Sequence, residues 1–131
     1  MAGETVPVVL LPKTTTLSGC IMSGEGFTTV AMDVTPYAGA SVTAWRGHVV
    51  GTVPVSPADP FELYFEQSND RQSWIECPGS PVGTPGHPGE NNAQSYYLLF
   101  FMRWFRVRVK LYDADNVVSC WILGSLEQRR R

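Results

Sequence analysis

The segment from Trp104 to Tyr112 alternates apolar and polar side chains, and this two-residue period constrains the fold more than any other feature. The apolar set is Phe105, Val107, Val109 and Leu111, and the basic set between them is Arg106, Arg108 and Lys110. Successive side chains of a β-strand point to opposite faces of its sheet. The segment is therefore predicted to be a strand with one face buried in a core and one basic face.

Several other segments carry a strand signature, and no stretch shows a helical period with caps. In residues 27–34, Val30, Met32 and Val34 share one side of the alternation. Residues 117–126 are apolar on both faces, so we expect both faces to be covered. The remaining predicted strands are 6–11, 41–55, 61–67, 73–77 and 95–101. Seven or eight short strands in 131 residues, 44% of them hydrophobic, predict one all-β domain, an antiparallel β-sandwich with a jelly-roll-like arrangement.

The N-terminal apolar run is bracketed by Pro7 and Pro12. Proline lacks the backbone donor that a strand ladder needs, so the run is either an edge strand or an extended arm, within residues 1–19. An arm of this kind packs on a neighbour through its apolar side chains. The candidate contact residues are Val8, Val9, Leu10 and Leu11. The sandwich itself is predicted over residues 20–126, followed by a basic tail over 127–131.

The longest polar segment runs from Pro78 to Gln94 and is rich in proline and glycine. This composition excludes a helix or an inner strand. Long loops in compact domains are functional or mobile, so the segment is either an ordered assembly loop or a mobile excursion.

The sequence offers no catalytic or metal-binding constellation. His48 and His87 stand far from each other and from any nucleophile motif, and Gly-x-Ser-x-Gly does not occur. Cys20, Cys77 and Cys120 lack the short spacing of a zinc site and are predicted to be free buried thiols, with one disulfide pair left open. Residues 113–116, Asp-Ala-Asp-Asn, are predicted to form a hairpin turn rather than a calcium loop. We therefore expect no enzymatic activity, no cofactor and no metal.

The basic stripe of Arg106, Arg108 and Lys110 has two interpretations. Glu62 and Glu66 form an acidic stripe on another predicted strand, and charge pairing between adjacent strands is the favoured interpretation. The alternative is a docking face for an acidic partner. Among the four tryptophans, Trp74 and Trp104 are the candidate contact residues, because the alternation places Trp104 on the face of the arginines.

The net charge of −2 argues against a nucleic-acid-binding surface. Arg129–Arg131 are predicted to be a solvated tail, with contact to nucleic acid or an acidic subunit as the alternative. The N-terminus has no secretory signal pattern, and no apolar run is long enough to cross a bilayer. We expect a protein that is made in a host cytoplasm and has no membrane partner.

Two segments resemble small structural proteins of tailed phages and gene-transfer particles. Residues 61–74 read FELYFEQSNDRQSW, and residues 104–126 read WFRVRVKLYDADNVVSCWILGSL. The resemblance implies a β-sandwich virion protein on a head surface, neck or tail. The implied partners are further copies of the chain and other particle proteins, such as a major capsid or tail protein.

The hairpin around Ser68–Asp70 and the strand after Trp104 are also similar to discoidin-type carbohydrate-binding sandwiches. This second resemblance implies a carbohydrate-binding module as the alternative function. Exposed, coplanar aromatic rings beside polar hydrogen-bonding groups would support it, and fully buried tryptophans would contradict it.

Overall fold

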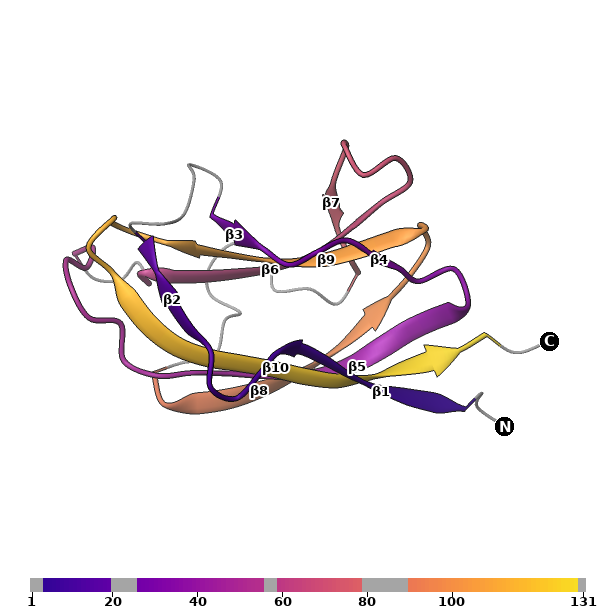
Figure 1. Cartoon of the computed structure of the whole chain (residues 1–131), viewed down its shortest axis with the longest axis horizontal. Coiled ribbons are helices and arrows are strands. Elements are labelled where there is room, and N and C mark those ends of the chain that lie inside the picture. The colour runs from indigo at the N-terminus through magenta and orange to yellow at the C-terminus, as the bar shows by residue number, and fades with distance from the viewer. Residues whose placement is uncertain (1–3, 20–25, 56–58, 79–89, 130–131) are drawn as a thin grey trace.

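The protein is a β-sandwich of two antiparallel sheets, which lie one above the other in Figure 1. The structure is a computed structural model that describes residues 4–19, 26–55, 59–78 and 90–129. The predicted all-β sandwich is confirmed. The expectations for Cys20, for most of the Pro78–Gln94 loop and for Arg130 and Arg131 lie outside the described residues.

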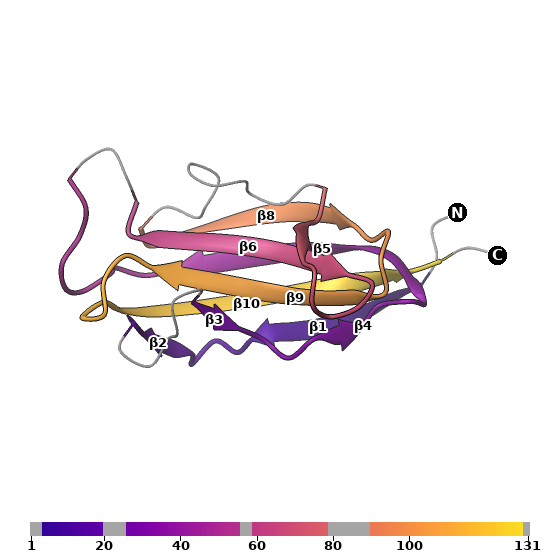
Figure 2. The same ribbon diagram turned by 90° about the horizontal axis from the view of Figure 1, so that it is seen from above.

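The first sheet has the strand order β1-β10-β5-β8, and β2 also pairs with β10. Its strands are β1 (Thr5–Leu11), β2 (Thr16–Ser18), β5 (Tyr37–Arg46), β8 (Asn92–Leu99) and β10 (Val117–Gln128). Strands β1 and β8 therefore form the two edges of this sheet, as the view from above shows (Figure 2). Glu127 and Gln128, which the sequence placed in a tail, belong to β10, and the backbone N–H of Arg129 donates to the carbonyl oxygen of Pro36.

The second sheet has the order β3-β9-β6-β7, and β4 pairs with β9 beside β3. Its strands are β3 (Phe27–Thr28), β4 (Met32–Asp33), β6 (Phe61–Ser68), β7 (Ile75–Glu76) and β9 (Trp104–Leu111). The predicted alternating strands after residues 61 and 104 are confirmed as β6 and β9. The predicted hairpin back to residue 77 is confirmed as the pair β6–β7.

The strand pairs are nested along the chain. The first described strand, β1, pairs with the last, β10, while β3 and β4 pair with β9, β5 with β8, and β6 with β7. Thr5 lies opposite Glu127, and the N–H of Gln128 donates to the carbonyl oxygen of Glu4. The two ends of the chain consequently leave the same end of the first sheet (Figure 1).

The core between the sheets consists of the inward-facing members of the alternating strands. Strand β6 contributes Phe61, Leu63 and Phe65, and β9 contributes Phe105 and its apolar neighbours, all of them buried. The rings of Phe65 and Phe105 stack at 6.4 Å between centroids. Burying one such side chain stabilises the fold by about 1.5–3 kcal/mol, so this alternation specifies which face of each strand points inward.

The two described cysteines are free and buried, as predicted: Cys77 beside β7 and Cys120 in β10. Burial raises the pKa of each thiol to about 12, with the charge of Glu66 adding to the effect at Cys77. A thiol with such a pKa is protonated and unreactive at neutral pH.

Residues 27–34 form two short strands instead of the single strand that the alternation predicted. The N–H of Thr29 donates to the carbonyl oxygen of Val107, and the Thr29 hydroxyl accepts the N–H of Val107 at 3.0 Å. A side-chain oxygen thus takes the place of a backbone carbonyl in the ladder, and the chain bulges outward. Val30, expected to face the core, is 90% exposed, while Val34 is buried.

The strand predicted over 41–55 starts earlier and ends earlier, since β5 covers Tyr37–Arg46. Beyond it, Val50 makes one isolated bridge to Val117, and Gly51 adopts a positive φ of 104°. The carboxylate of Asp115 accepts the N–H of Thr52 at 3.0 Å and holds this segment against the turn between β9 and β10. Beyond Arg46 the segment is therefore held by separate contacts and not by a regular strand ladder.

Candidate interaction surfaces

The outer face of the second sheet carries the predicted basic stripe, and the acidic stripe lies beside it. Glu66 is opposite Arg106 in the β6–β9 register, and its two carboxylate oxygens accept hydrogen bonds from Nε of Arg106 at 2.9 Å and Nε of Arg108 at 3.1 Å. The three side chains are 7%, 18% and 19% exposed, respectively. Cross-strand charge pairing is therefore confirmed for Arg106 and Arg108, whereas Lys110, opposite Glu62, is exposed.

Aromatic rings cover the same arginines. The guanidinium of Arg106 lies 4.0 Å from the ring centroid of Trp74, and that of Arg108 lies 4.1 Å from the ring of Tyr64. The Tyr64 hydroxyl donates to Glu62 at 2.5 Å, and burial followed by the Glu62 carboxylate raises its pKa to about 12. The stripe is thus a layered network of charges and rings, so its basic groups already have partners within the chain.

Trp104 occupies the other end of this face and is half-buried. The guanidinium groups of Arg71 and Arg103 lie 4.6 Å and 5.1 Å from the centroid of its ring. Arg103 in turn pairs with Asp33 at 3.2 Å. The sequence left open whether the arginine face is partly covered or whether Trp104 is an exposed contact residue, and these contacts show that side chains of the same chain partly cover the ring.

The turn that delivers Trp74 to this face is organised by Asp70. Its carboxylate accepts the backbone N–H groups of Gln72 and Ser73, each at 2.8 Å, and the hydroxyl of Ser68. These bonds hold the pKa of Asp70 down at about 2. Arg71 adopts a positive φ of 62°, which completes the tight turn.

Glu76 lies directly opposite Glu66 in the β6–β7 register. Its Oε1 atom is buried, and no group in the described part of the chain donates a hydrogen bond to it. Burial, and then the negative charge of Glu66, raise the pKa of Glu76. Two neighbouring carboxyl groups in different environments are a common arrangement in acid–base catalysis. Here, however, both carboxylate oxygens of Glu66 accept hydrogen bonds from arginines, and the Glu66 side chain is shielded from solvent.

The outer face of the first sheet carries a second aromatic pair, formed by Trp45 and Trp121. These residues lie opposite each other on β5 and β10, with ring centroids 6.3 Å apart and planes inclined by 13°. The amino group of Lys13 lies 5.3 Å from the ring of Trp121. Both rings are half-buried, and the hydroxyl groups of Thr43 and Ser95 form a hydrogen bond of 3.0 Å nearby on the same face.

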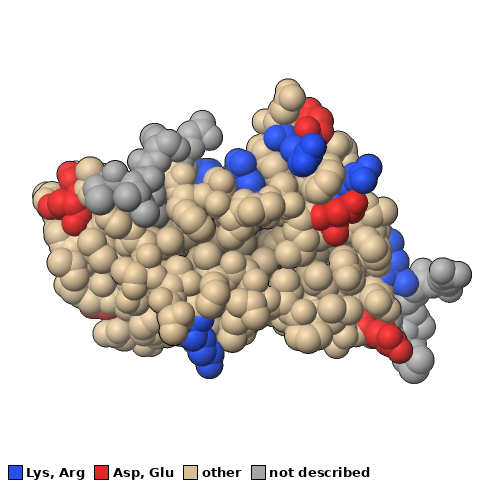
Figure 3. Space-filling view, viewed as in Figure 1, with Lys and Arg blue, Asp and Glu red and all other residues tan. Residues whose placement is uncertain are grey.

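The surface around this pair, which we call the low-charge face, carries few charged groups, one of which is Lys13 beside Trp121. Among the described residues of β5, β8 and β10 that point outward, Glu127 alone is charged. The outward set is Gly39, Ser41, Thr43, Trp45, Ala93, Ser95, Tyr97, Leu99, Val117, Ser119, Trp121, Leu123, Ser125 and Glu127. Figure 3 views the sandwich from the side: most charged groups lie over the upper sheet and at the ends, and one basic side chain projects from the lower side. Tyr97, Leu99 and Val117 remain 48%, 38% and 37% exposed.

The predicted N-terminal contact strand is β1, an edge strand of this same sheet. Val8 and Leu10 turn toward the core, Leu11 is buried, and Val9 points outward and is exposed. The pairing with β10 shifts register between Val9 and Leu11, and Pro7 lies in the strand. In the described structure this segment completes its own sheet rather than extending away from it.

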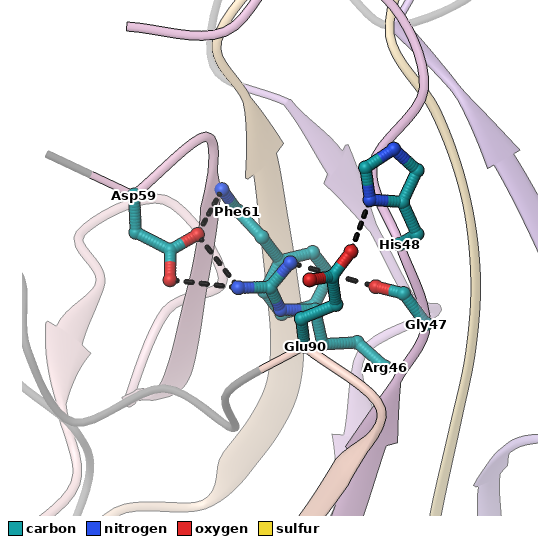
Figure 4. Close-up of polar contacts among 6 residues, drawn as sticks. All are labelled: Arg46, Gly47, His48, Asp59, Phe61 and Glu90. Atoms are coloured by element: carbon teal, nitrogen blue, oxygen red, sulfur yellow. Dashed lines mark hydrogen bonds and ion pairs between the residues drawn. The ribbon is translucent and has the colours of Figure 1, made fainter. Parts of the chain in front are cut away.

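A buried arginine closes one end of the sandwich (Figure 4). Arg46 donates from Nη2 to both carboxylate oxygens of Asp59, at 3.0 and 2.8 Å, and its guanidinium lies 5.6 Å from the ring of Phe61. Asp59 also accepts the N–H of Phe61 at 2.9 Å. His48 and Glu90 form an exposed pair next to this cluster. The arginine thus fastens the end of β5 to the start of β6.

The described residues contain no group of three or more histidine, cysteine, aspartate or glutamate side chains placed to hold a metal ion. No described helix is long and apolar enough to span a bilayer. Comparison of the chain with protein-family models, with curated proteins and with solved structures gave no match.

Proposed function

We propose that this protein is a non-enzymatic structural protein that self-associates through its first sheet and builds or decorates a virion or virus-like particle. The observation that carries the proposal is the low-charge face. Strand β10 points Val117, Trp121 and Leu123 outward, and in the described structure no further sheet or helix lies over them, with Lys13 beside the Trp121 ring. A sheet face with so little charge and exposed apolar side chains is typical of a surface that a protein partner covers.

The nested strand pairs support a jelly-roll arrangement, which we propose as the finer description of the fold. Pairing the first strand with the last, and so on inward to the β6–β7 hairpin, describes one long ribbon folded over itself. Jelly rolls occur in viral capsid and lectin domains. This is a fold-level analogy, and it agrees with both functions that the sequence suggested.

The assignment to a particle rests on the resemblance of residues 61–74 and 104–126 to phage structural proteins. Those residues form β6, the β6–β7 turn, β9 and β10, which make up the middle of both sheets. Under this proposal the partners are further copies of the chain and a major capsid or tail protein.

The test is the mass of the native protein by light scattering during size-exclusion chromatography, over a range of concentrations. We expect a mass above that of the single 14.5 kDa chain. Ser41→Lys, in the middle of the low-charge face, should reduce association, whereas Thr28→Lys on the second sheet should leave the mass unchanged. A single-chain mass at every concentration would contradict self-assembly.

The Trp45–Trp121 pair favours carbohydrate binding as a second candidate function. Near-parallel, half-exposed indoles beside the hydroxyls of Thr43 and Ser95 offer both stacking and hydrogen bonding to a sugar. Titration of tryptophan fluorescence with a panel of oligosaccharides tests it, with Trp45→Ala as the variant and Trp104→Ala as the control. A saturable change that Trp45→Ala abolishes supports glycan binding, and no change with any sugar contradicts it.

A further inference from the structure

Strand β8 leaves a row of backbone hydrogen-bonding groups pointing away from its own sheet. The N–H of Phe100 donates to Ala38 on the β5 side, whereas the N–H of Leu99 donates to Pro78 on the opposite side. Because backbone groups alternate along a strand, the N–H groups of Ala93, Ser95 and Tyr97 point to that same outer side. No strand of the described structure pairs with β8 there.

The two edges of the first sheet differ in their protection. Edge strands of soluble proteins are commonly blocked by proline, charge or a bulge. Strand β1 has Pro7 and a register shift between Val9 and Leu11. Strand β8 has the sequence NAQSYYLL without proline or charge, and it pairs with β5 in unbroken register from Arg46–Asn92 to Gly39–Leu99. Apart from the Leu99–Pro78 hydrogen bond, this edge is regular and has no proline, charge or bulge to block it, and no described strand pairs with it.

The side chains beside this edge leave it open. The Tyr97 hydroxyl donates to Glu127 on β10 at 3.3 Å, so its ring lies across β5 and away from the edge. Gly39 of β5 leaves space for this ring, because a Cβ atom at that position would lie 3.4 Å from the Tyr97 hydroxyl oxygen. Ala93 and Ser95 are small and exposed.

We propose that two copies of the chain pair through β8, antiparallel, with Ser95 opposite Ser95 of the second copy on the two-fold axis. This inference rests on the proposed self-association and adds to it a contact through the sheet edge, which leaves the low-charge face available to a further partner. In this register Ala93 of each copy lies opposite Tyr97 of the other. The side chains of Ala93, Ser95 and Tyr97 therefore all lie on the same face of the joined sheet in both copies. No like charges oppose each other, because the strand has none. The two first sheets become one continuous sheet, and the low-charge faces form one surface.

The variant Ser95→Lys tests this pairing, because it places two ammonium groups beside the two-fold axis. The side chain of Ser95 is exposed and shares one hydrogen bond with Thr43 among the described residues, so circular dichroism should report an intact fold. We expect the dimer dissociation constant to rise at least about tenfold, since like charges at an interface are strongly unfavourable. The matched control is Thr5→Lys, an exposed residue on the protected edge of the same sheet.

A cross-link identifies the register. In hydrogen-bonded antiparallel pairs the Cα atoms are about 5.5 Å apart, so Ser95→Cys should give a covalent dimer with a short bis-maleimide. Both variants also carry Cys20→Ser, which rules out a reaction at the cysteine that lies outside the described residues. In this background Thr5→Cys should remain a single chain, and the buried Cys77 and Cys120 are shielded. If the wild-type protein associates but Ser95→Lys keeps its mass and Ser95→Cys fails to cross-link, the β8 pairing is overturned while self-assembly stands. A wild-type protein that is monomeric throughout overturns both.

Discussion

The two sheets of this sandwich bury similar cores but finish their outer faces in different ways. On the second sheet, Glu66 joins Arg106 and Arg108, and the rings of Trp74 and Tyr64 cover the arginines. On the first sheet, Trp45 and Trp121 lie among serine, threonine and leucine side chains, with Lys13 above one ring. On the second sheet the charged groups have partners within the chain, whereas the first sheet leaves apolar side chains in contact with solvent.

This difference separates stability from assembly. A charge network with partners inside the chain is costly to disrupt and offers few groups to another molecule. A low-charge face has few polar interactions to lose when a partner covers it, and its exposed apolar side chains favour such contact. We therefore expect mutations on the second sheet to act on folding, and mutations on the first sheet to act mainly on association.

The largest effect is expected from Glu66→Ala, which leaves two mostly buried arginines without their shared carboxylate. Removing one partner of a buried ion pair costs about 3 kcal/mol or more in the free energy of unfolding. Glu127→Ala, the matched change on the first sheet, should cost less than about 0.5 kcal/mol, as surface substitutions usually do. Urea denaturation measures both, and equal costs would remove the contrast between the two faces.

The tryptophan pair should give the next largest effect. In a double-mutant cycle of Trp45→Ala and Trp121→Ala, we expect a coupling energy of about 0.5–1.5 kcal/mol, because parallel aromatic neighbours stabilise each other beyond their buried area. The cycle of Trp104→Ala with Trp121→Ala should show no coupling, because these rings lie on opposite faces of the sandwich. Coupling in the second cycle would contradict the separation of the sheets.

Glu76→Gln should stabilise the protein, since it removes a carboxylate that faces Glu66. Like charges directly opposite each other on adjacent strands destabilise by a few tenths to about 1 kcal/mol. The pKa of Glu76 is raised in the folded state, so its protonated form favours folding. That contribution is complete below the unfolded value of about 4.5 and is lost as the pH rises through the folded-state pKa. The difference between variant and wild type should therefore be small at pH 4 and larger at pH 7 in urea titrations, with Glu62→Gln as the control.

The smallest effect is expected from Lys13→Met, which keeps the side-chain stem over Trp121 but removes the charge. An exposed cation–π contact contributes about 0.5 kcal/mol, so thermal unfolding should shift only slightly. Arg106→Met, the corresponding change above Trp74, should cost more because it also removes one of the two arginine partners of Glu66. If Lys13→Met lowered the unfolding temperature more than Arg106→Met, the proposed contrast between the two faces would be wrong.

Alternation predicted the second sheet well because its information is local. The apolar members of β6 and β9 face the core, and the acidic and basic stripes meet in register, as the sequence pattern indicated. The pattern was wrong at Val30, where the Thr29 hydroxyl enters the strand ladder and turns the next residue outward. A side chain that replaces a backbone acceptor leaves no trace in hydrophobic periodicity.

The features of the first sheet depend on strand order, which the sequence pattern does not contain. Trp45 and Trp121 meet only because β5 and β10 are neighbours, so the sequence pattern favoured Trp74 and Trp104 as the contact residues instead. The unprotected edge is likewise invisible until β8 is known to be the last strand of its sheet. The available signal was composition: Asn92–Leu99 lacks both proline and charge.

The pairing of β1 with β10 also determines when β1 can join its sheet during synthesis. Strand β1 leaves the ribosome before every other described strand, yet its partner is made after all of them. Contacts between such distant segments require a large loop to close, which slows folding. The inner β6–β7 hairpin is complete first, and the outer pairs can add around it in turn. Until Val117–Gln128 has emerged, the nascent chain must carry the apolar segment Val6–Leu11 exposed, which makes this segment a natural target for a chaperone.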